Sequence, residues 1–469
     1  MNPATAPSPL SFLPELLAEH EQRLTTGPIA PAVTPAEIRA HLRRYDFAAP
    51  RDLEALTREV AGLFGQWNLQ VPHPGYLGLF NPATSPASVA ADALVALYNP
   101  QLAVWAHAPA AQELERHVLH FLADRMGYPA DGFFANFTTG GSEANHTAVL
   151  AALAHRFPDY LAGGLRALPR RPVVYVSAMG HNSFDKIAKN TGLGLDALRK
   201  IPVDARLKMD VDALERQIQL DQAAGHEPLM VVGTAGTTAS GTIDPLPRLA
   251  GVAARHRLWF HVDAAWAGAA VLSDRLRPHL DGIALADSIT IDAHKWFSVA
   301  MGAGMFFTRH PAAVQAAFNI PASYMPSHLQ TEPYVTTLQW SRRCIGLKLF
   351  LALAEQGAGG LARQMEQQCE LAHHLSRKLH ATGWLVVNDS PVGVVNFTHP
   401  ALRAGSLGAP EVQQILEREG DFWLSTVPLP GHGPVLRACV TSFHTRPATV
   451  DALVDRLNKM VAEAALPRG

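Results

Sequence analysis

The feature that most constrains the fold is an alternation of strand-like and helix-like segments in the middle of the 469-residue chain. Five strand-like runs, several of them continuously apolar, are predicted as strands: Pro172–Ser177, Leu229–Gly233, Trp259–Asp263, Ser288–Asp292 and Gly304–Thr308. Three longer segments are predicted as helices: Ser142–His155, Ala213–Ala224 and Leu246–His256. This alternation is typical of βαβ units and predicts a mostly parallel sheet. The continuous apolar strands favour a sheet that helices cover on both faces.

The segments on either side of this region follow other patterns. Before it come three predicted helices and then a loop rich in proline and glycine: Leu10–Thr25, Pro35–Tyr45, Asp52–Trp67 and the loop Val71–Pro86. After about Gly360 the predicted helices are Leu361–Thr382, Ala409–Glu419 and Thr449–Ala465, and the predicted strands are Trp384–Val387, Val394–Thr398 and Val435–Thr441. We therefore predict an α/β protein with an N-terminal helical segment (1–85), a large domain (86–360) and a small C-terminal α+β domain (361–469).

Composition and charge argue against several classes of function. The 39 basic and 41 acidic residues give a net charge of −2, which leaves no basic excess for nucleic acid. The apolar runs fall short of the roughly 18 residues that a membrane span needs, and Met1–Leu17 lacks the pattern of a signal peptide. Three widely spaced cysteines, Cys344, Cys369 and Cys439, fit a reducing compartment. We expect a cytoplasmic protein without nucleic-acid or membrane partners.

A lysine comes directly after one of the predicted strands. Lys295 stands in the run Ile291–Trp296, and ligands bind at the carboxyl ends of strands in open α/β sheets. A buried lysine loses its charge readily and becomes an amine nucleophile toward aldehydes. A surface lysine that ends a strand is the simpler interpretation, and Lys295 alone does not exclude it.

A carboxylate is expected at the same edge of the sheet. Asp263 ends the predicted strand before that of Lys295, in the run His261–Gly268. The ring of pyridoxal 5'-phosphate (PLP) needs a carboxylate beside its pyridine nitrogen, because the pair keeps the ring protonated and makes it an electron sink. Ala265 is small and leaves room for a flat ring. A helix cap or a metal ligand is the alternative for Asp263.

Three further motifs supply groups that PLP requires. Gly141 and Ser142 come just before an apolar helix, whose N-terminus would bind a phosphate, although a plain turn has the same sequence. His181 follows the strand Pro172–Ser177 and could stack on a cofactor ring, although a lone histidine is more often structural. Thr238 ends a run of hydroxyl residues after another strand.

Together these motifs place an amine, a carboxylate, a phosphate-binding turn and a stacking ring at the ends of neighbouring strands. This is the set of groups that PLP requires, so we predict PLP as the cofactor. The competing interpretation is a metal site built from His181, His261, Asp263 and His294. It explains neither the Gly-Gly-Ser turn nor Lys295, and we predict no metal.

The same motifs resemble the group II PLP-dependent amino acid decarboxylases, which include aromatic amino acid, histidine and glutamate decarboxylases. The likeness runs from about His73 to Arg437, and the spacing from Asp263 to Lys295 (295 − 263 = 32 residues) matches the family. The resemblance implies a PLP-dependent transferase fold of type I, in which 86–360 binds PLP, and an obligate homodimer with active sites at the interface. It implies conversion of an L-amino acid to the amine and CO₂.

The resemblance leaves the substrate open. An aromatic amino acid is slightly favoured; an acidic one (glutamate or aspartate), a decarboxylating aldehyde synthase and a non-catalytic partner subunit are the alternatives. Gln101 and Ala103 replace bulkier apolar residues of the aromatic enzymes, which implies a wider or more polar pocket. The retained Lys295, Asp263 and His181 argue against a non-catalytic protein.

The resemblance also implies roles for individual residues. Lys295 would form the Schiff base, Asp263 would pair with the pyridine nitrogen, and His181 would stack on the ring near the substrate. The other residues expected at the cofactor are Gly141, Ser142, Thr238, Ala265, Asp292 and His294. Asp292 stands where several relatives have asparagine, and a carboxylate there would repel the phosphate if the two were close.

The remaining expected roles concern the substrate and the proton that replaces its carboxyl group. The residues expected at the substrate are Phe80, Asn81, Ala103, Trp105 and Arg437, and Gln101–Trp105 resembles a segment that the partner subunit contributes. Tyr324, in the loop Asn319–Tyr334, is the predicted proton donor, with Tyr334 as the weaker candidate. A tyrosine at this position favours simple decarboxylation, since the aldehyde synthases typically have phenylalanine there.

Overall fold

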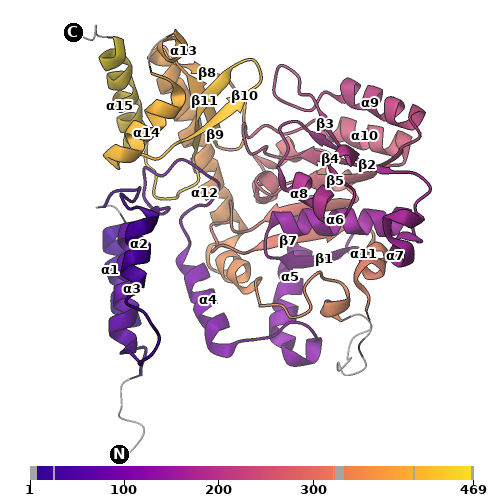
Figure 1. Cartoon of the computed structure of the whole chain (residues 1–469), viewed down its shortest axis with the longest axis horizontal. Coiled ribbons are helices and arrows are strands. Elements are labelled where there is room, and N and C mark those ends of the chain that lie inside the picture. The colour runs from indigo at the N-terminus through magenta and orange to yellow at the C-terminus, as the bar shows by residue number, and fades with distance from the viewer. Residues whose placement is uncertain (1–7, 25–26, 321, 323–331, 405–406, 466–469) are drawn as a thin grey trace, which may run out of the picture.

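The computed structural model describes residues 8–24, 27–320, 322, 332–404 and 407–465. Its largest feature is a seven-stranded sheet with helices on both faces, and a smaller four-stranded sheet lies toward the C-terminus (Figure 1). The predicted α/β class and the small C-terminal domain with helices and strands are confirmed. No helix within these ranges is both long and apolar enough to cross a membrane.

The large sheet has the strand order β1-β7-β6-β5-β4-β2-β3. Its strands are β1 (Phe134–Thr138), β2 (Pro172–Ser177), β3 (Leu198–Ile201), β4 (Glu227–Thr234), β5 (Trp259–Asp263), β6 (Ser288–Asp292) and β7 (Gly304–Thr308). Strands β3, β2, β4, β5 and β6 pair in parallel, whereas β7 runs antiparallel to both β6 and β1. Strands β2, β5, β6 and β7 are buried along their whole length, as expected for a sheet covered on both faces.

Four of the five predicted strands have the predicted bounds, and β4 extends beyond the predicted Leu229–Gly233 at both ends. Two strands of this sheet were not predicted. The short β1 has a polar residue, Asn136, in its centre and is completed by antiparallel pairing with β7. The edge strand β3 has the sequence Leu-Arg-Lys-Ile and is only partly buried, so it carries little hydrophobic signal.

Helices pack against this sheet on both sides (Figure 1). The helices that contact its strands are α5 (Pro109–Met126), α6 (Gly141–Arg156), α8 (Ser183–Asn190), α9 (Val211–Ala223) and α10 (Leu246–His256). Of the other helices in this region, α7 (Tyr160–Gly163) and α11 (Pro311–Phe318) contact α6, and α4 (Pro86–Tyr98) contacts the long helix Leu347–Ala381. Helix α6 is rich in alanine, and ten of its residues are buried. Small side chains let this helix lie close to the sheet, with its N-terminus at the end of β1.

The helix after Gly346 corrects one prediction. Instead of beginning at Leu361, α12 spans Leu347–Ala381. Within this span Gly357 leaves the helical conformation (φ 69°, ψ 161°), so α12 consists of two helical stretches that meet at a kink there. The predicted domain limit between residues 360 and 361 lies inside this helix; both domain limits stay predictions.

The small sheet is antiparallel and has the order β10-β11-β9-β8. Its strands are β8 (Leu385–Val386), β9 (Val394–Thr398), β10 (Ser425–Leu429) and β11 (Gly433–Cys439), and its helices are α13 (Pro400–Ala404), α14 (Ala409–Glu419) and α15 (Pro447–Ala465). Strand β10, which contains Pro428, was not predicted, and β11 lies two residues earlier than expected. Pro428 sits on an edge strand, where the missing N–H costs no ladder hydrogen bond.

The loop before residue 81 is attached to this small sheet, far from it in sequence. Leu77 N donates to Trp423 O (2.9 Å), and Cys439 N donates to Leu77 O (2.7 Å). A side-chain carbon at Gly78 would overlap the ring of Trp423, so only glycine fits this close approach. The pairing fixes Phe80 at the boundary between the two sheets.

The three N-terminal helices lie at the side of the molecule, away from the large sheet (Figure 1). They are α1 (Leu13–Arg23), α2 (Pro35–Leu42) and α3 (Leu53–Trp67), each shorter than predicted. Thr34 and Glu37 form a capping box at α2, and Asp52 caps α3 by accepting from Ala55 N. None of these helices contains a buried residue.

Candidate active site

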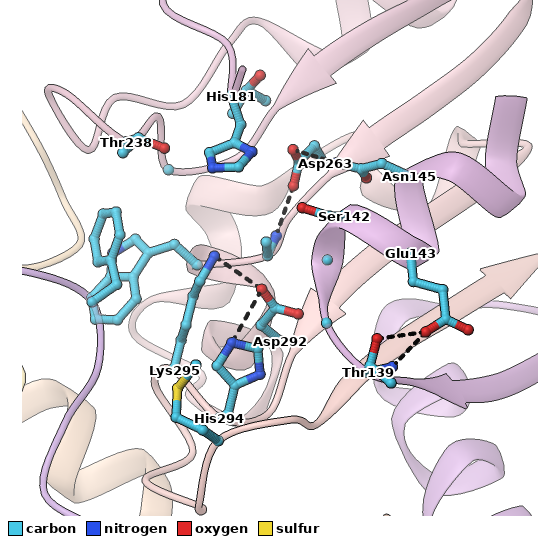
Figure 2. Close-up of a pocket in the computed structure, with 18 residues that line it drawn as sticks. Thr139, Ser142, Glu143, Asn145, His181, Thr238, Asp263, Asp292, His294 and Lys295 are labelled. Atoms are coloured by element: carbon cyan, nitrogen blue, oxygen red, sulfur yellow. Dashed lines mark hydrogen bonds and ion pairs between the residues drawn. The ribbon is translucent and has the colours of Figure 1, made fainter. Parts of the chain in front are cut away.

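A cavity of about 360 Å³ lies at the carboxyl ends of β4, β5 and β6 and beside the N-terminus of α6 (Figure 2). It brings together residues that the sequence places far apart. Ten of the predicted site residues line it: Phe80, Gly141, Ser142, His181, Thr238, Asp263, Ala265, Asp292, His294 and Lys295. Figure 2 shows His181 and Thr238 on one side of the cavity and Lys295 with His294 on the other.

Lys295 reaches the cavity from the turn that follows β6. Its Nζ lies 3.0 Å from Asp292 Oδ2, and its side chain is 22% exposed, so the amine is accessible from the cavity. Asp292 is buried at 3% exposure, and His294 Nε2 lies 3.7 Å from the same carboxylate oxygen. Burial lowers the pKa of His294, which favours its neutral form. In this arrangement the carboxylate of Asp292 pairs with the lysine ammonium.

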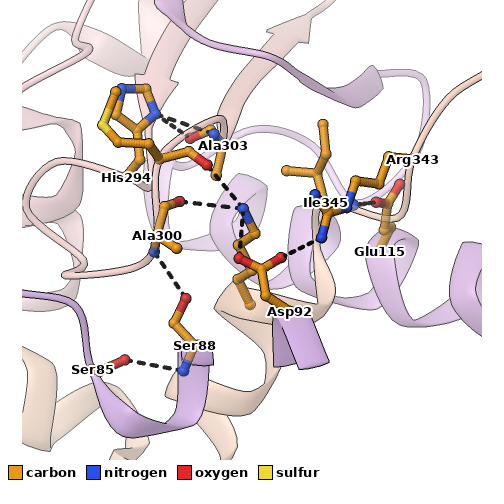
Figure 3. Close-up of polar contacts among 11 residues, drawn as sticks. Ser85, Ser88, Asp92, Glu115, His294, Ala300, Ala303, Arg343 and Ile345 are labelled. Atoms are coloured by element: carbon orange, nitrogen blue, oxygen red, sulfur yellow. Dashed lines mark hydrogen bonds and ion pairs between the residues drawn. The ribbon is translucent and has the colours of Figure 1, made fainter. Parts of the chain in front are cut away.

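A buried lysine holds the loop that follows Lys295 (Figure 3). Lys348, near the start of α12, donates to Met301 O (3.0 Å) and Ala300 O (3.4 Å). Its Nζ also lies 3.4 Å from Asp92 Oδ2 on α4. Ala300 N donates to Ser88 Oγ (2.9 Å), so α4 and α12 fix this loop together. The loop in turn carries Met301, which lines the cavity.

The N-terminus of α6 forms one wall of the cavity. A side-chain carbon at Gly141 would lie 2.9 Å from Asp292 Oδ2 and 3.3 Å from Ala265 Cβ, so this wall has no room for a larger residue. Ser142 adds a hydroxyl, and a helix N-terminus supplies amide donors for an anion. Glu143 accepts two hydrogen bonds from Thr139, because Thr139 N and Oγ1 donate to Glu143 Oε2 at 2.9 and 2.6 Å. The site therefore matches the phosphate of PLP, with Asp292 close to it.

Asp263 ends β5 at the opposite side of the cavity from Lys295. It is almost fully buried; Asn145 Nδ2 donates to Asp263 Oδ2 (3.0 Å), and Ala265 N donates to Asp263 Oδ1 (3.2 Å). His181 Nδ1 accepts from Ser183 N (3.2 Å), which leaves the proton on Nε2. Burial lowers the pKa of His181, partly offset by the charge of Asp263, so the ring is neutral near pH 7.

Eight of the 18 residues that line the cavity were missed by the sequence-based prediction, and Asn145 and Trp266 are the two with the most direct contacts to the others. Asn145 lies one helical turn after Gly141, a spacing that puts both on the same face of α6 and could have revealed it. Trp266 packs on Phe80 in a tilted arrangement with ring centroids 4.3 Å apart, and it stacks on Trp296 at 4.7 Å. Nothing in the sequence showed that Trp266 would meet Phe80, which is 186 residues earlier (266 − 80).

Several predicted substrate residues lie outside the cavity of the single chain. Asn81 Oδ1 accepts from Tyr76 OH (2.7 Å). Trp105 N donates to Glu332 Oε2 (2.7 Å), and Tyr334 N donates to Ala103 O (3.0 Å). These residues are not part of the cavity wall among the described residues. Tyr324 lies outside the described residues.

Arg437 lies next to the cavity and contacts one of its wall residues. Its side chain is 1% exposed, and the guanidinium carbon lies 4.7 Å from the centroid of the Phe80 ring. Nη1 donates to Gly78 O (2.5 Å) and to Ser425 Oγ (3.1 Å). Nε and Nη2 are buried, and neither has a hydrogen-bond partner in the described part of the chain. The small domain thus places an incompletely paired cation behind Phe80.

The groups in the cavity fit PLP. It holds an accessible amine, a buried carboxylate with its own donors, a neutral histidine ring and a helix N-terminus whose glycine keeps the wall open. Elsewhere in the described ranges, and in this cavity, no three His, Cys, Asp or Glu side chains converge as metal ligands would.

Comparison with known proteins covers nearly the whole chain. Residues 50–399 match the model of the pyridoxal-dependent decarboxylase conserved domain. Human cysteine sulfinic acid decarboxylase is 31% identical over 417 residues, which cover 84% of this chain and 83% of that protein. The aromatic-L-amino-acid decarboxylase of Bacillus atrophaeus is 28% identical over 454 residues, 94% of this chain and 91% of that one. The crystal structure of mouse CSAD in apo form matches with a TM-score of 0.90 at 26% identity, over 97% of this chain and 98% of that chain.

Proposed function

Because the chain belongs to the pyridoxal-dependent decarboxylase family, we propose that its substrate is a short L-amino acid with an acidic side chain. The chain is a PLP-dependent carboxy-lyase, which releases CO₂ from an amino acid. The acidic substrate class goes beyond family membership, and one feature of the site supports it: the incompletely paired guanidinium of Arg437 behind Phe80.

A buried cation without an anionic partner is costly, because it has lost its hydration and gained little in return. Arg437 forms no ion pair with any described Asp or Glu, and two of its nitrogens lack acceptors. The ring of Phe80 also lies 5.8 Å from Lys295 Nζ, so both cations contact the same ring. A negatively charged substrate side chain near Phe80 would compensate the charge of Arg437. The similarity to cysteine sulfinic acid decarboxylase agrees with this class of substrate.

The residues of the cavity have separate proposed tasks. When bound, PLP supplies an aldehyde that joins to amines and a ring that takes up the electrons left when CO₂ departs. Lys295 would hold the aldehyde carbon, and Gly141 and Ser142 the phosphate. Asp263 would keep a proton on the pyridine nitrogen, and His181 would cover one face of the ring. Trp266 and Phe80 would keep water away from the reacting carbon.

The aromatic substrate class is the second candidate. Phe80 and Trp266 give the cavity an aromatic wall, and the similarity to the Bacillus atrophaeus enzyme extends over 94% of the chain.

Tyr324 stays the predicted proton donor, with Tyr334 as the weaker candidate. The presence of Tyr324 favours amine rather than aldehyde as the product. With dissolved O₂ as the oxidant, Tyr324→Phe would shift the products from amine and CO₂ toward aldehyde, ammonia, CO₂ and hydrogen peroxide. If amine remained the only product at an unchanged rate, another group would deliver the proton.

The substrate class is tested by measuring CO₂ release from a panel of amino acids. The panel contains aspartate, glutamate, cysteine sulfinate, tryptophan, tyrosine, dihydroxyphenylalanine, diaminobutyrate and ornithine. We expect the highest kcat/KM with an acidic member. Arg437→Lys should raise KM for that substrate by about tenfold, because a bidentate contact to a carboxylate is lost. Arg456→Lys is the matched control, since Arg456 pairs with Glu419 far from the cavity. A higher kcat/KM with the aromatic members would overturn the acidic class and support the second candidate.

We also propose a homodimer whose interface includes α4 and the N-terminal helices. These helices expose large apolar side chains, among them Leu13, Leu53, Phe64, Leu97 and Tyr98. The segment 101–105 follows α4 directly, and its position outside the cavity agrees with the resemblance to the group II decarboxylases, in which this segment serves the partner subunit.

The cytoplasmic location stays a prediction. All three cysteines are free and buried, which agrees with a reducing compartment.

A further inference from the structure

Asp263 can serve the pyridine nitrogen only if it stays ionised inside the protein. Its side chain is buried, and an isolated carboxylate there would favour the neutral, protonated form. Two donors contact it directly: Ala265 N and the side-chain amide of Asn145. Figure 2 shows Asn145 reaching toward Asp263 from α6. The amide is itself the end of a longer chain of hydrogen bonds.

This chain of hydrogen bonds continues from Asn145 into the protein interior behind Asp263. Asn145 Oδ1 lies 3.0 Å from His261 Nε2, and His261 Nδ1 lies 2.8 Å from Ser288 Oγ. Trp259 Nε1 donates to Ser288 Oγ (2.8 Å). All of these side chains are buried, and they come from α6, β5 and β6.

The geometry of the strands explains why these residues meet. Trp259, His261 and Asp263 alternate along β5, so they lie on one face of the sheet, the face toward α6. Ser288 is the register partner of His261 on the neighbouring β6. Asn145, on α6, forms hydrogen bonds with two residues of β5, His261 and Asp263. Because side chains alternate between the two faces of a strand, the residues of this hydrogen-bond chain that come from β5 all face α6.

With Asp263 ionised, the matching of donors to acceptors assigns one direction to each hydrogen bond in this chain. An ionised carboxylate only accepts, so Asn145 must face Asp263 with its amide nitrogen, whose other hydrogen reaches Ser183 Oγ (3.2 Å). Asn145 Oδ1 then needs a donor, which is His261 Nε2–H. His261 Nδ1 carries no proton and accepts from the Ser288 hydroxyl, which itself accepts from the tryptophan N–H. Burial lowers the pKa of His261 to about 4, so its ring is neutral near pH 7.

On the premise that Asp263 pairs with the pyridine nitrogen, we propose that Asn145 and His261 are positioning residues that hold Asp263 ionised and aimed at the cofactor. Each bond in the chain donates toward the carboxylate, so the bonds polarise one another in the same sense. Ser288 and Trp259 fix the tautomer of His261. Loss of His261 would free the amide of Asn145 to rotate and would weaken the donor that the carboxylate needs.

The test compares two forms of the cofactor bound to the apoenzyme. One is PLP, and the other is the analogue in which a C–H group replaces the ring nitrogen. His261→Phe keeps a ring but removes both nitrogens, and Asn145→Leu keeps the shape of the amide but removes its donor. We expect either variant to raise the equilibrium Kd for PLP, measured by protein fluorescence, by about tenfold. The Kd for the analogue should stay unchanged, because Asp263 has no partner there.

His261→Gln is the matched control, because its side-chain nitrogen can still donate to Asn145; we expect it to bind PLP nearly as wild type does. If His261→Phe and Asn145→Leu lost equal affinity for PLP and for the analogue, the two residues would have a general structural role, and the proposal would be overturned. Unchanged affinity for PLP in both variants would overturn it as well. If His261→Phe does not fold, Asn145→Leu alone decides.

Asp263→Ala separates this proposal from its premise. If that variant binds PLP as tightly as wild type, the pairing of Asp263 with the nitrogen is wrong and the proposal fails with it. If Asp263→Ala loses affinity for PLP only, while His261→Phe and Asn145→Leu bind normally, the pairing holds and the positioning role alone is refuted.

Discussion

Gly141 and Asp292 meet at the wall of the cavity where the phosphate is expected. The carboxylate oxygen of Asp292 lies 2.9 Å from the point that a side-chain carbon at Gly141 would occupy. The same carboxylate pairs with Lys295 Nζ. A negative group so near a phosphate site is balanced here by the lysine ammonium, which makes the spacing of these three residues sensitive to any added atom.

Gly141→Ala is predicted to impair cofactor binding without unfolding the protein. The added methyl group would press against the Asp292 carboxylate and Ala265 Cβ, so the wall or the carboxylate must move into the cavity. We expect the Kd for PLP to rise about tenfold or more, measured by fluorescence titration of the apoenzyme. Gly140→Ala is the control, because its added carbon meets His294 Cε1 at 3.5 Å, an ordinary contact, and its φ of 165° is extended. Equal effects of the two substitutions would contradict the steric explanation.

His261 makes the stability of the apoenzyme depend on pH. Its pKa is about 4 in the folded chain, against about 6.5 for an exposed histidine, because burial disfavours the charged ring. The unfolded chain therefore binds the proton at higher pH. The neutral ring of His261 therefore contributes about 3 kcal/mol at most to the free energy of unfolding. This contribution is complete above about pH 6.5 and is lost as the pH falls toward 4.

The prediction is checked by thermal midpoints of wild type and His261→Gln between pH 7.5 and 5. The advantage of wild type over the variant should shrink as the pH falls, since glutamine does not titrate. Other buried histidines such as His181 and His294 titrate in both proteins and cancel in the difference. A constant difference over the whole range would show that His261 is not coupled to folding in this way.

At the scale of elements, α12 connects the two sheets of the molecule. Its first turns hold the loop after Lys295 through Lys348, and its later turns pack on the small sheet and α15. The kink at Gly357 joins the two helical stretches of α12, so that each of them contacts a different part of the molecule. The loop at residues 75–78 makes a second connection, because it pairs with the small sheet and carries Phe80 into the cavity.

Gly357→Ala is predicted to destabilise the chain although the site is spacious. No atom lies within 4 Å of the added carbon, so the cost comes from the backbone, whose φ of 69° with ψ of 161° is strained for any L side chain. We expect a loss of about 1–3 kcal/mol, seen as a lower thermal midpoint. Gly359→Ala is the control within the same helix; it meets only the end of the Arg363 side chain and should leave the midpoint unchanged or higher. A lower midpoint for Gly359→Ala alone would contradict the prediction.

At the scale of the whole molecule, the N-terminal helices and α4 present apolar surface that the single chain does not cover. Leu97 and Tyr98 on α4 are 73% and 76% exposed. The described chain holds α1–α3 mainly through contacts among themselves and through the loop that follows them. This exposed apolar surface is the observation that supports the proposed homodimer.

Leu97→Glu is predicted to weaken the proposed homodimer, because it places a charge in an apolar interface. We expect a shift from dimer to monomer, measured by light scattering after size exclusion, together with lower activity. Leu220→Glu on α9 is the control: Leu220 is also exposed, at 63%, but lies on the opposite side of the large sheet region from α4 (Figure 1). The interface would have to be placed elsewhere if Leu97→Glu remained a dimer or if both variants dissociated alike.

The sequence by itself determined which segments form the buried strands and which residues stand at their ends. Strands β2, β5, β6 and β7 are short runs rich in apolar, β-branched and aromatic residues, and a local pattern is enough to place them. Because parallel strands end at one edge, the sequence also predicted that Asp263, His181 and Lys295 would share a cavity. It could not predict β1, β3 and β10, whose short or polar sequences become strands only through pairing with neighbours.

Only the tertiary structure decided what surrounds these groups. Asn145 meets His261 across 116 residues and Asp263 across 118, and Arg437 meets Gly78 across 359. Such contacts depend on how helices and sheets pack, which no local pattern encodes. The sequence thus predicted that an amine and a carboxylate share one cavity, whereas packing set the hydrogen-bond chain behind Asp263, the ion pair of Asp292 with Lys295 and the buried cation behind Phe80. The physical reason is that burial and charge pairing are properties of the folded chain, while strand and motif are properties of the neighbouring residues.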